Sequence, residues 1–160
     1  MKLIVKNKLI SWGGSSTVLD ENGNVIFKVK GKVFSLRRKK VICDATGKKL
    51  YIVKNKLFNF WTHKSFIYDA NKQKIASVKN RGFKGGYDVL GYEDEISLEG
   101  WGLKGYTILK DGEEIGEVKT HILSVADSYE VTVADDQDPA FVVALIIAID
   151  NVKDNSTKHN

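Results

Sequence analysis

The sequence predicts a mainly β domain of consecutive hairpins that enclose one apolar helix near the C-terminal end. Three observations support this fold: a repeated hairpin phrase, a middle region rich in glycine and aromatic residues, and an unbroken apolar run at residues 140–149. With 160 residues, 42% of them hydrophobic and a single Pro, the chain is long enough to bury a core. We expect one domain over residues 1–152 and a polar tail over residues 153–160.

The hairpin phrase is a hydrophobic stretch, a polar turn and a second hydrophobic stretch. Its copies occupy residues 17–30, 41–54, 66–79 and, more weakly, 107–119. In the first two copies the turn runs from Asp to Gly, at Asp20–Gly23 and Asp44–Gly47. Asp accepts backbone hydrogen bonds within such turns, and Gly supplies the positive φ that they need. The turn of the third copy starts at Asp69 and lacks the Gly, so Asn71 is expected to take the left-handed position.

Alternation after the first turn indicates one buried and one exposed face. Val25, Phe27 and Val29 are expected on the inner face, because side chains two residues apart point the same way. The outer face then receives Ile26, Lys28 and Lys30.

Further strands are expected on both sides of a glycine-rich segment at residues 82–106, whose glycines mark tight corners or close backbone approach. The other expected strands are residues 33–36, 57–60, around Phe83, 106–109, 114–118 and 128–133.

The apolar run at residues 140–149 has no alternation. Its Val and Ile content suits a buried strand. Asp138 as N-cap and Pro139 at the first helical position favour a helix instead, over about residues 139–151. A helix that is apolar on every side must be buried on every side. At about 15 Å its ten apolar residues span roughly half a bilayer core, so we expect it inside the sheet rather than across a membrane.

The chain resembles the LURP-one-related proteins, which belong with the phospholipid scramblases to the tubby C-terminal-like superfamily. The segments that carry the resemblance are residues 18–31, 34–36, 42–47 and 144–150. It covers roughly residues 3–152 and implies a closed antiparallel barrel of about twelve strands around a central helix. The matching positions are turns and core residues, and none is catalytic. For function, the resemblance implies only an association with lipid, since tubby binds phosphoinositides and scramblases act at membranes.

Charge is divided unevenly along the sequence. Residues 1–90 hold 20 Lys and Arg against 5 Asp and Glu, a net +15. Residues 91–160 hold 5 against 15, a net −10, and the sequence leaves open whether this division is also spatial. A basic half suits an anionic partner, although exposed strand faces of soluble proteins are also rich in Lys.

The sharpest basic feature is the run of four consecutive cations at residues 37–40. We predict an anion-binding site made of Arg37, Arg38, Lys39 and Lys40, supported by Lys28 and Lys30. An anionic phospholipid or phosphoinositide headgroup is the favoured ligand. An acidic protein partner and a solvated turn remain alternatives, while nucleic acid is disfavoured because no recognition motif is present.

No pattern of catalytic or metal-binding residues stands out. Cys43 is the single cysteine and is expected to be a small packed side chain, and His63, His121 and His159 form no closely spaced pair. We expect no enzyme, no cofactor and no metal site. Calcium at Asp135, Asp136 and Asp138 is left open, because carboxylates at a helix start are also explained by the helix dipole.

The sequence therefore predicts a non-enzymatic binding module that docks to anionic headgroups through a basic face. The alternative is a structural or protein-interaction scaffold without a small ligand. The absence of a secretion signal in the sequence and the single cysteine predict a cytoplasmic protein. We also expect a monomer, and the lipid-binding interpretation implies peripheral attachment to membranes.

Overall fold

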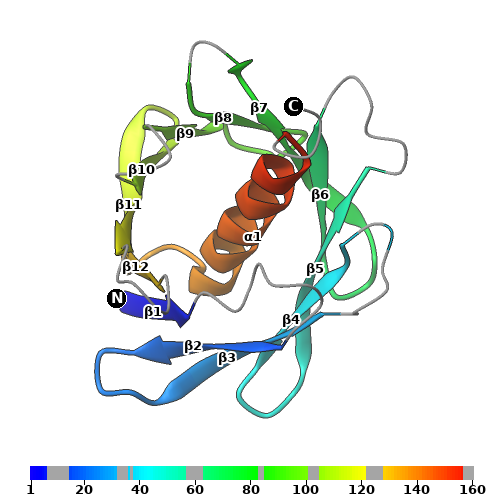
Figure 1. The fold of residues 1–160 in the computed structure, drawn as a ribbon. Helices are drawn as coiled ribbons and strands as arrows, with labels where there is room; N and C mark the ends of the chain where they lie inside the picture. The colour runs from blue at the N-terminus through cyan, green and yellow to red at the C-terminus, as the bar shows by residue number, and fades with distance from the viewer. Residues whose placement is uncertain are drawn as a thin grey trace.

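The computed structural model is a closed antiparallel β-barrel with one helix running through it (Figure 1). It describes residues 1–6, 15–31, 36, 38–56, 63–82, 85–100, 105–121 and 128–156. Within these ranges the strands pair in the order of the sequence, and β1 closes the barrel against β12. The predicted fold, a twelve-stranded barrel with an enclosed helix, is confirmed.

The wall begins with β1 (Lys2–Lys6) and continues with the six strands of the three strong repeats. These six are β2 (Ser16–Asp20), β3 (Val25–Gly31), β4 (Lys40–Asp44), β5 (Lys49–Asn55), β6 (Lys64–Tyr68) and β7 (Lys74–Asn80). The remaining strands are β8 (Tyr87–Leu90), β9 (Ile96–Glu99), β10 (Gly105–Lys110), β11 (Glu113–His121) and β12 (Ser128–Val133). The strands expected at residues 106–109, 114–118 and 128–133 are therefore present. Those expected at residues 33–36, 57–60 and around Phe83 lie outside the described residues, apart from Leu36 at a turn.

The repeat turns are built by their aspartates. In the first, Asp20 Oδ1 accepts the backbone N–H groups of Asn22 and Asn24 at 2.9 and 2.8 Å, and Gly23 has φ +83°. The second turn repeats this arrangement at the corresponding positions. In the third, Lys72 takes the left-handed conformation with φ +67°, so the prediction for Asn71 was wrong. Lys72 N–H donates to the carbonyl of Asp69 at 3.1 Å. In each of these three turns the residue that makes this contact, three after the Asp, is the one that takes the left-handed conformation.

Each hairpin also contains a β-bulge that the simple alternation missed. The register shifts beside Ile26, Leu50 and Ile75, which pack against the core as the extra residue of their strand. A bulge reverses the facing of the residues beyond it. Val25 is consequently 38% exposed, and the prediction that it shares the inner face with Phe27 was wrong.

Glycines allow strands to approach closely at the barrel corners, as expected. Gly105 has φ +120°, and a Cβ there would lie 1.9 Å from the carbonyl oxygen of Val118 on β11. No residue other than glycine fits this position without moving the backbone of the neighbouring strand.

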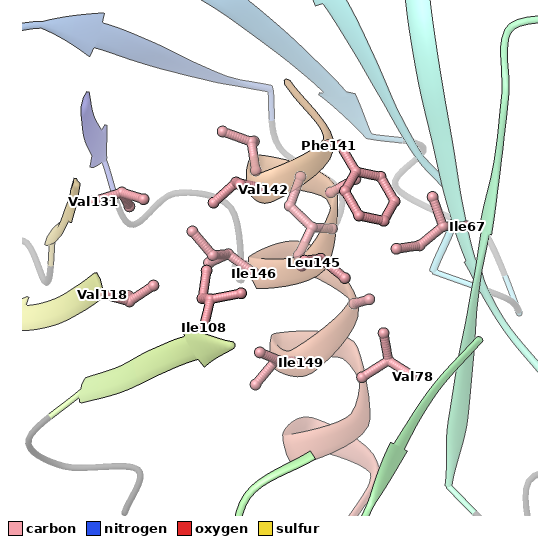
Figure 2. Packing of buried hydrophobic residues seen from close by; sticks show 14 of the residues in the cluster. Ile67, Val78, Ile108, Val118, Val131, Phe141, Val142, Leu145, Ile146 and Ile149 are labelled. Atoms are coloured by element: carbon pink, nitrogen blue, oxygen red, sulfur yellow. The ribbon is translucent and has the colours of Figure 1, made fainter. Parts of the chain in front are cut away.

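The helix α1 (Pro139–Ser156) fills the barrel. Asp138 caps it, because its Oδ1 accepts the Ala140 N–H at 2.8 Å. Every residue from Ala140 to Val152 is buried. Figure 2 shows helix side chains such as Leu145 and Ile146 directed at valines and isoleucines of the surrounding strands. The helix ends five residues later than predicted and extends into the expected tail.

Two contacts give the barrel a direction. Near the helix start, Tyr51 at the beginning of β5 donates its hydroxyl to Asp138 Oδ2 at 2.6 Å. Near the helix finish, Asn55 at the end of β5 donates its amide to the Asn151 carbonyl at 3.3 Å. The repeat turns precede β3, β5 and β7 and so lie at the helix-start end, which we call the turn end. The opposite end, where α1 finishes, is called the rim end.

Candidate functional site

The order of the strands converts the uneven charge of the sequence into a spatial division. Because neighbours in sequence are neighbours in the wall, β1 to β8 form one continuous side from residues 1–90. The acidic remainder supplies β9 to β12 and α1. The question that the sequence left open is thus answered by topology: the basic residues share one side of the barrel.

Within that side, cations gather at the rim end, on or next to β3, β5, β6 and β7 and just before β4. Lys64 on β6 and Lys79 on β7 are register partners, so two cations lie directly opposite each other. Lys56 follows β5, and its N–H bonds the Lys64 carbonyl at 3.0 Å, which places a third cation at the same edge. We call this set the basic rim, and its members are Lys30, Arg38, Lys39, Lys54, Lys56, Lys64 and Lys79.

The repeat itself produces the rim. In each strong copy the second strand ends with a buried Val followed by an outward Lys. These pairs are Val29 and Lys30, Val53 and Lys54, and Val78 and Lys79. The same register that buries the valine therefore sends one lysine per hairpin to the outer edge of the rim end.

Aromatic rings accompany these cations on the outer wall. Lys54 Nζ lies 4.8 Å from the centre of the Tyr68 ring, and Lys74 Nζ lies 5.2 Å from that of Phe66. Cation–π contact of this kind holds an ammonium at a ring face and contributes about 0.5–1 kcal/mol at exposed sites. Neither of these two contacts involves Lys64 or Lys79, and like charges directly opposite each other on neighbouring strands are destabilising.

Arg81 and Lys119, two cations outside the basic rim, form ion pairs with carboxylates. Arg81, just after β7, donates to Asp88 Oδ1 and Glu99 Oε1, both at 2.5 Å. These two carboxylates raise the pKa of the Arg81 guanidinium, the Glu99 hydrogen bond contributing most. In the fourth copy, Lys119 pairs with Glu117 Oε2 at 3.1 Å. The charge of both cations is therefore neutralised locally.

The predicted run at residues 37–40 does not form one exposed patch. Lys40 begins β4 with the facing of Ile42, pairs with Val53 and is only 5% exposed. Burial lowers the pKa of Lys40, and repulsion from Arg38 lowers it further. Lys40 thus points into the barrel mouth rather than to solvent.

The other predicted residues are divided between the rim and the wall. Arg38 and Lys39 are half-buried just before β4, and Arg37 lies outside the described residues. Lys30 is exposed at the rim. Lys28 is also exposed on β3, but its Nζ donates to the Ala45 carbonyl at 2.9 Å and so reaches toward the turn end.

Four members of the basic rim, Lys54, Lys56, Lys64 and Lys79, were not predicted as site residues. A signal for Lys79 was present, since Lys30, Lys54 and Lys79 recur with the same spacing as the repeat aspartates. Lys64 had no such signal, because it precedes the third copy and reaches the rim only through its pairing with β7.

A second polar group lies inside the barrel at the rim end. Tyr129 donates its hydroxyl to Asp150 Oδ1 at 3.1 Å, and the rings of Tyr87 and Tyr106 meet edge to face at 5.7 Å. Burial raises the pKa of both Tyr87 and Tyr106, so they stay neutral. The Tyr129 hydrogen bond holds the last turns of α1 against β12, and Lys153 Nζ on α1 lies 4.9 Å from the centre of the Tyr106 ring on β10.

Two of the three carboxylates considered for calcium, Asp135 and Asp138, have structural partners at the turn end. Asp138 caps α1 with one oxygen and accepts the Tyr51 hydroxyl with the other. Asp135 Oδ1 lies 3.1 Å from the Met1 amino group. Across the described ranges, no three His, Cys, Asp or Glu side chains are grouped closely enough to hold a metal ion.

Comparison with known families decides the relationship. The model of the family described as LURP-one-related matches residues 1–150. The chain belongs to the LURP-one-related family. A crystal structure of a protein from Arabidopsis thaliana is similar to this LURP-one-related fold, with a TM-score of 0.67 and 21% identity over 95% of this chain and 91% of the other. A comparison with curated proteins found no match.

The described part of this LURP-one-related chain has no helix with both the length and the apolar character needed to span a membrane.

Proposed function

We propose that this LURP-one-related protein is a non-enzymatic module that binds anionic phospholipid headgroups reversibly through its basic rim. The observation that carries the proposal is the position of seven cations at the rim end of β3 to β7 and the segments beside them, three of these cations being placed there by the repeat. It replaces the predicted site around residues 37–40 with a broader one, in which Arg38, Lys39 and Lys30 remain. Lys40 is left out because it is buried.

The arrangement suits a surface of many negative charges. A Lys or Arg near an anionic membrane contributes about 1 kcal/mol, so several rim cations together support binding that salt can reverse. Screening acts over about 8 Å at physiological ionic strength, which makes exposed contacts of this kind sensitive to salt. We therefore expect a cytoplasmic, monomeric protein that attaches to membranes peripherally.

Vesicle sedimentation tests the proposal. The protein is spun with vesicles of phosphatidylcholine alone, of phosphatidylcholine with phosphatidylserine, and of phosphatidylcholine with phosphoinositide, each at low and high salt. We expect cosedimentation with both anionic compositions at low salt and loss of it at high salt. A difference between the two anionic compositions at equal surface charge would identify headgroup selectivity.

The alternative is a scaffold that binds proteins and no lipid. It predicts indifference to all three vesicle compositions at low salt. That result would refute lipid binding and would leave an acidic protein as the partner for the rim.

A further inference from the structure

We propose that the protein docks end-on to an anionic bilayer, with the rim end toward the lipid and the Leu36 side chain inserted between headgroups. This inference rests on the proposed function and adds an orientation and an apolar anchor to it. The proposed binding partner is a bilayer surface rather than a soluble anion.

The exposure of Leu36 is the first observation that supports this orientation. Leu36 is 94% exposed, whereas the other exposed large hydrophobic residues among the described ranges lie between 37% and 52%. It belongs to the connection from β3 to β4, which leaves and re-enters the barrel at the rim end. A fully exposed leucine gains nothing from a free anion, but it gains the free energy of apolar transfer when it enters a bilayer.

The base of this connection is fixed to the core. Arg38, two residues after Leu36, has φ +45°, and its carbonyl accepts the side-chain amide of Asn151 at 3.4 Å. Asn151 is buried in α1 and is 6% exposed. The attachment fixes Arg38, and Leu36 lies two residues before it in the sequence, so an apolar side chain and the cations of Arg38 and Lys39 belong to one short segment.

The opposite end of the barrel repels an anionic surface. Exposed carboxylates in its turns and beside the helix start are Glu21, Glu93, Glu95, Asp111, Glu113, Glu114, Asp135 and Asp136. The same end also carries the exposed lysines Lys2, Lys28, Lys48, Lys49, Lys72 and Lys74, which the carboxylates outnumber, so its net charge is negative while that of the rim end is positive. An anionic membrane attracts the rim end and turns the acidic end away, which orients the approach before any contact is made.

A pair of fluorescent probes tests the orientation. In a Cys43→Ala background, which removes the buried native thiol, Leu36→Cys and Val25→Cys are each labelled with the environment-sensitive dye NBD. Val25 is 38% exposed at the start of β3, at the turn end, and serves as the matched position. With phosphatidylserine vesicles we expect the probe at residue 36 to shift to the blue and lose quenching by iodide, while the probe at residue 25 stays unchanged.

An unlabelled pair measures the anchor itself. Leu36→Gln is expected to weaken binding to phosphatidylserine vesicles about tenfold or more, as for a leucine that loses apolar burial. Val25→Gln is expected to leave binding unchanged. Both residues are exposed, so folding of the variants is checked by their circular dichroism.

The outcomes separate this inference from the proposed function. If the protein cosediments but the probe at residue 36 stays in water, end-on docking is wrong and lipid binding stands. A shielded probe at residue 25 would show the reverse orientation and would also overturn the inference. If the unlabelled protein ignores anionic vesicles at low salt, the proposed function and the orientation both fail.

Discussion

Removing charge at the rim end should cost far more lipid binding than removing the same charge elsewhere. The triple variant Lys54→Gln, Lys64→Gln and Lys79→Gln takes three of the seven rim cations and lowers the formal net charge of +5 by three. At about 1 kcal/mol per cation the loss is about 3 kcal/mol, which corresponds to a factor of about 100 in the partition coefficient. Salt reduces this factor, so it is measured at low ionic strength.

The matched control removes three turn-end lysines. Lys48→Gln, Lys49→Gln and Lys72→Gln change the net charge equally, and all three side chains are exposed. If net charge alone determined binding, the two triple variants would lose affinity equally. We expect the factor by which the control lowers the partition coefficient to be less than about a tenth of the factor for the rim variant, because the charges of the control face away from the membrane.

The rim variant should remain folded. Lys64 and Lys79 oppose each other across β6 and β7, so neutralising them relieves repulsion. Lys54→Gln loses one cation–π contact, worth about 0.5–1 kcal/mol. Thermal unfolding checks that the melting temperature is preserved, and binding is titrated with vesicles of rising phosphatidylserine content. Equal affinity of the rim variant and the control, with both folded, would refute the reasoning.

The remaining predictions concern stability. Lys72→Gly should raise the free energy of unfolding by up to about 1 kcal/mol in urea titrations, because Lys72 has φ +67° where the other repeats have Gly; a decrease would contradict this. Gly105→Ala should cost more than about 3 kcal/mol, since its Cβ would overlap the Val118 carbonyl oxygen. Gly112→Ala, with open space around it, should cost less in the same assay. Hydrogen bonds, first that from the Thr46 hydroxyl, lower the pKa of Asp44 below 3.8. Its stabilisation is therefore full above pH 3.8 and is lost as the pH falls through the lowered value. Asp44→Ala should accordingly be less stable than the parent protein at neutral pH and should lose less stability in acid, and an unchanged acid dependence would count against the assignment.

The hairpins and the helix start were predictable because they depend on local chemistry. Asp20 and Asp44 bond the backbone of their own turns, and Asp138 with Pro139 defines the start of α1. In each of these contacts the two partners are no more than four residues apart in the sequence. Such signals are legible in a single sequence, since no distant strand is needed to interpret them.

Features that depend on register were harder to predict. Val25 faces outward because of a bulge opposite Leu19, and nothing in the local alternation marks that bulge. The inward direction of Lys40 was encoded, because Ile42 lies two residues further on the same face. The prediction for residues 37–40 considered the charge of the four side chains and not the face of the strand on which each one lies. The end of α1 was placed too early because polar residues after Asp150 suggested a tail, although Val152 is buried in the barrel.

The position of the helix in the sequence has a consequence for synthesis. Every wall strand precedes α1, and the first strand meets the twelfth through pairs such as Leu3 with Val131. Hairpins form early from neighbouring residues, but the ring can join only after more than a hundred residues have been made. The element that fills it emerges from the ribosome later still. Until then the inward valines and isoleucines have nothing to pack on, so the nascent chain must carry an unfilled lining that chaperones would recognise.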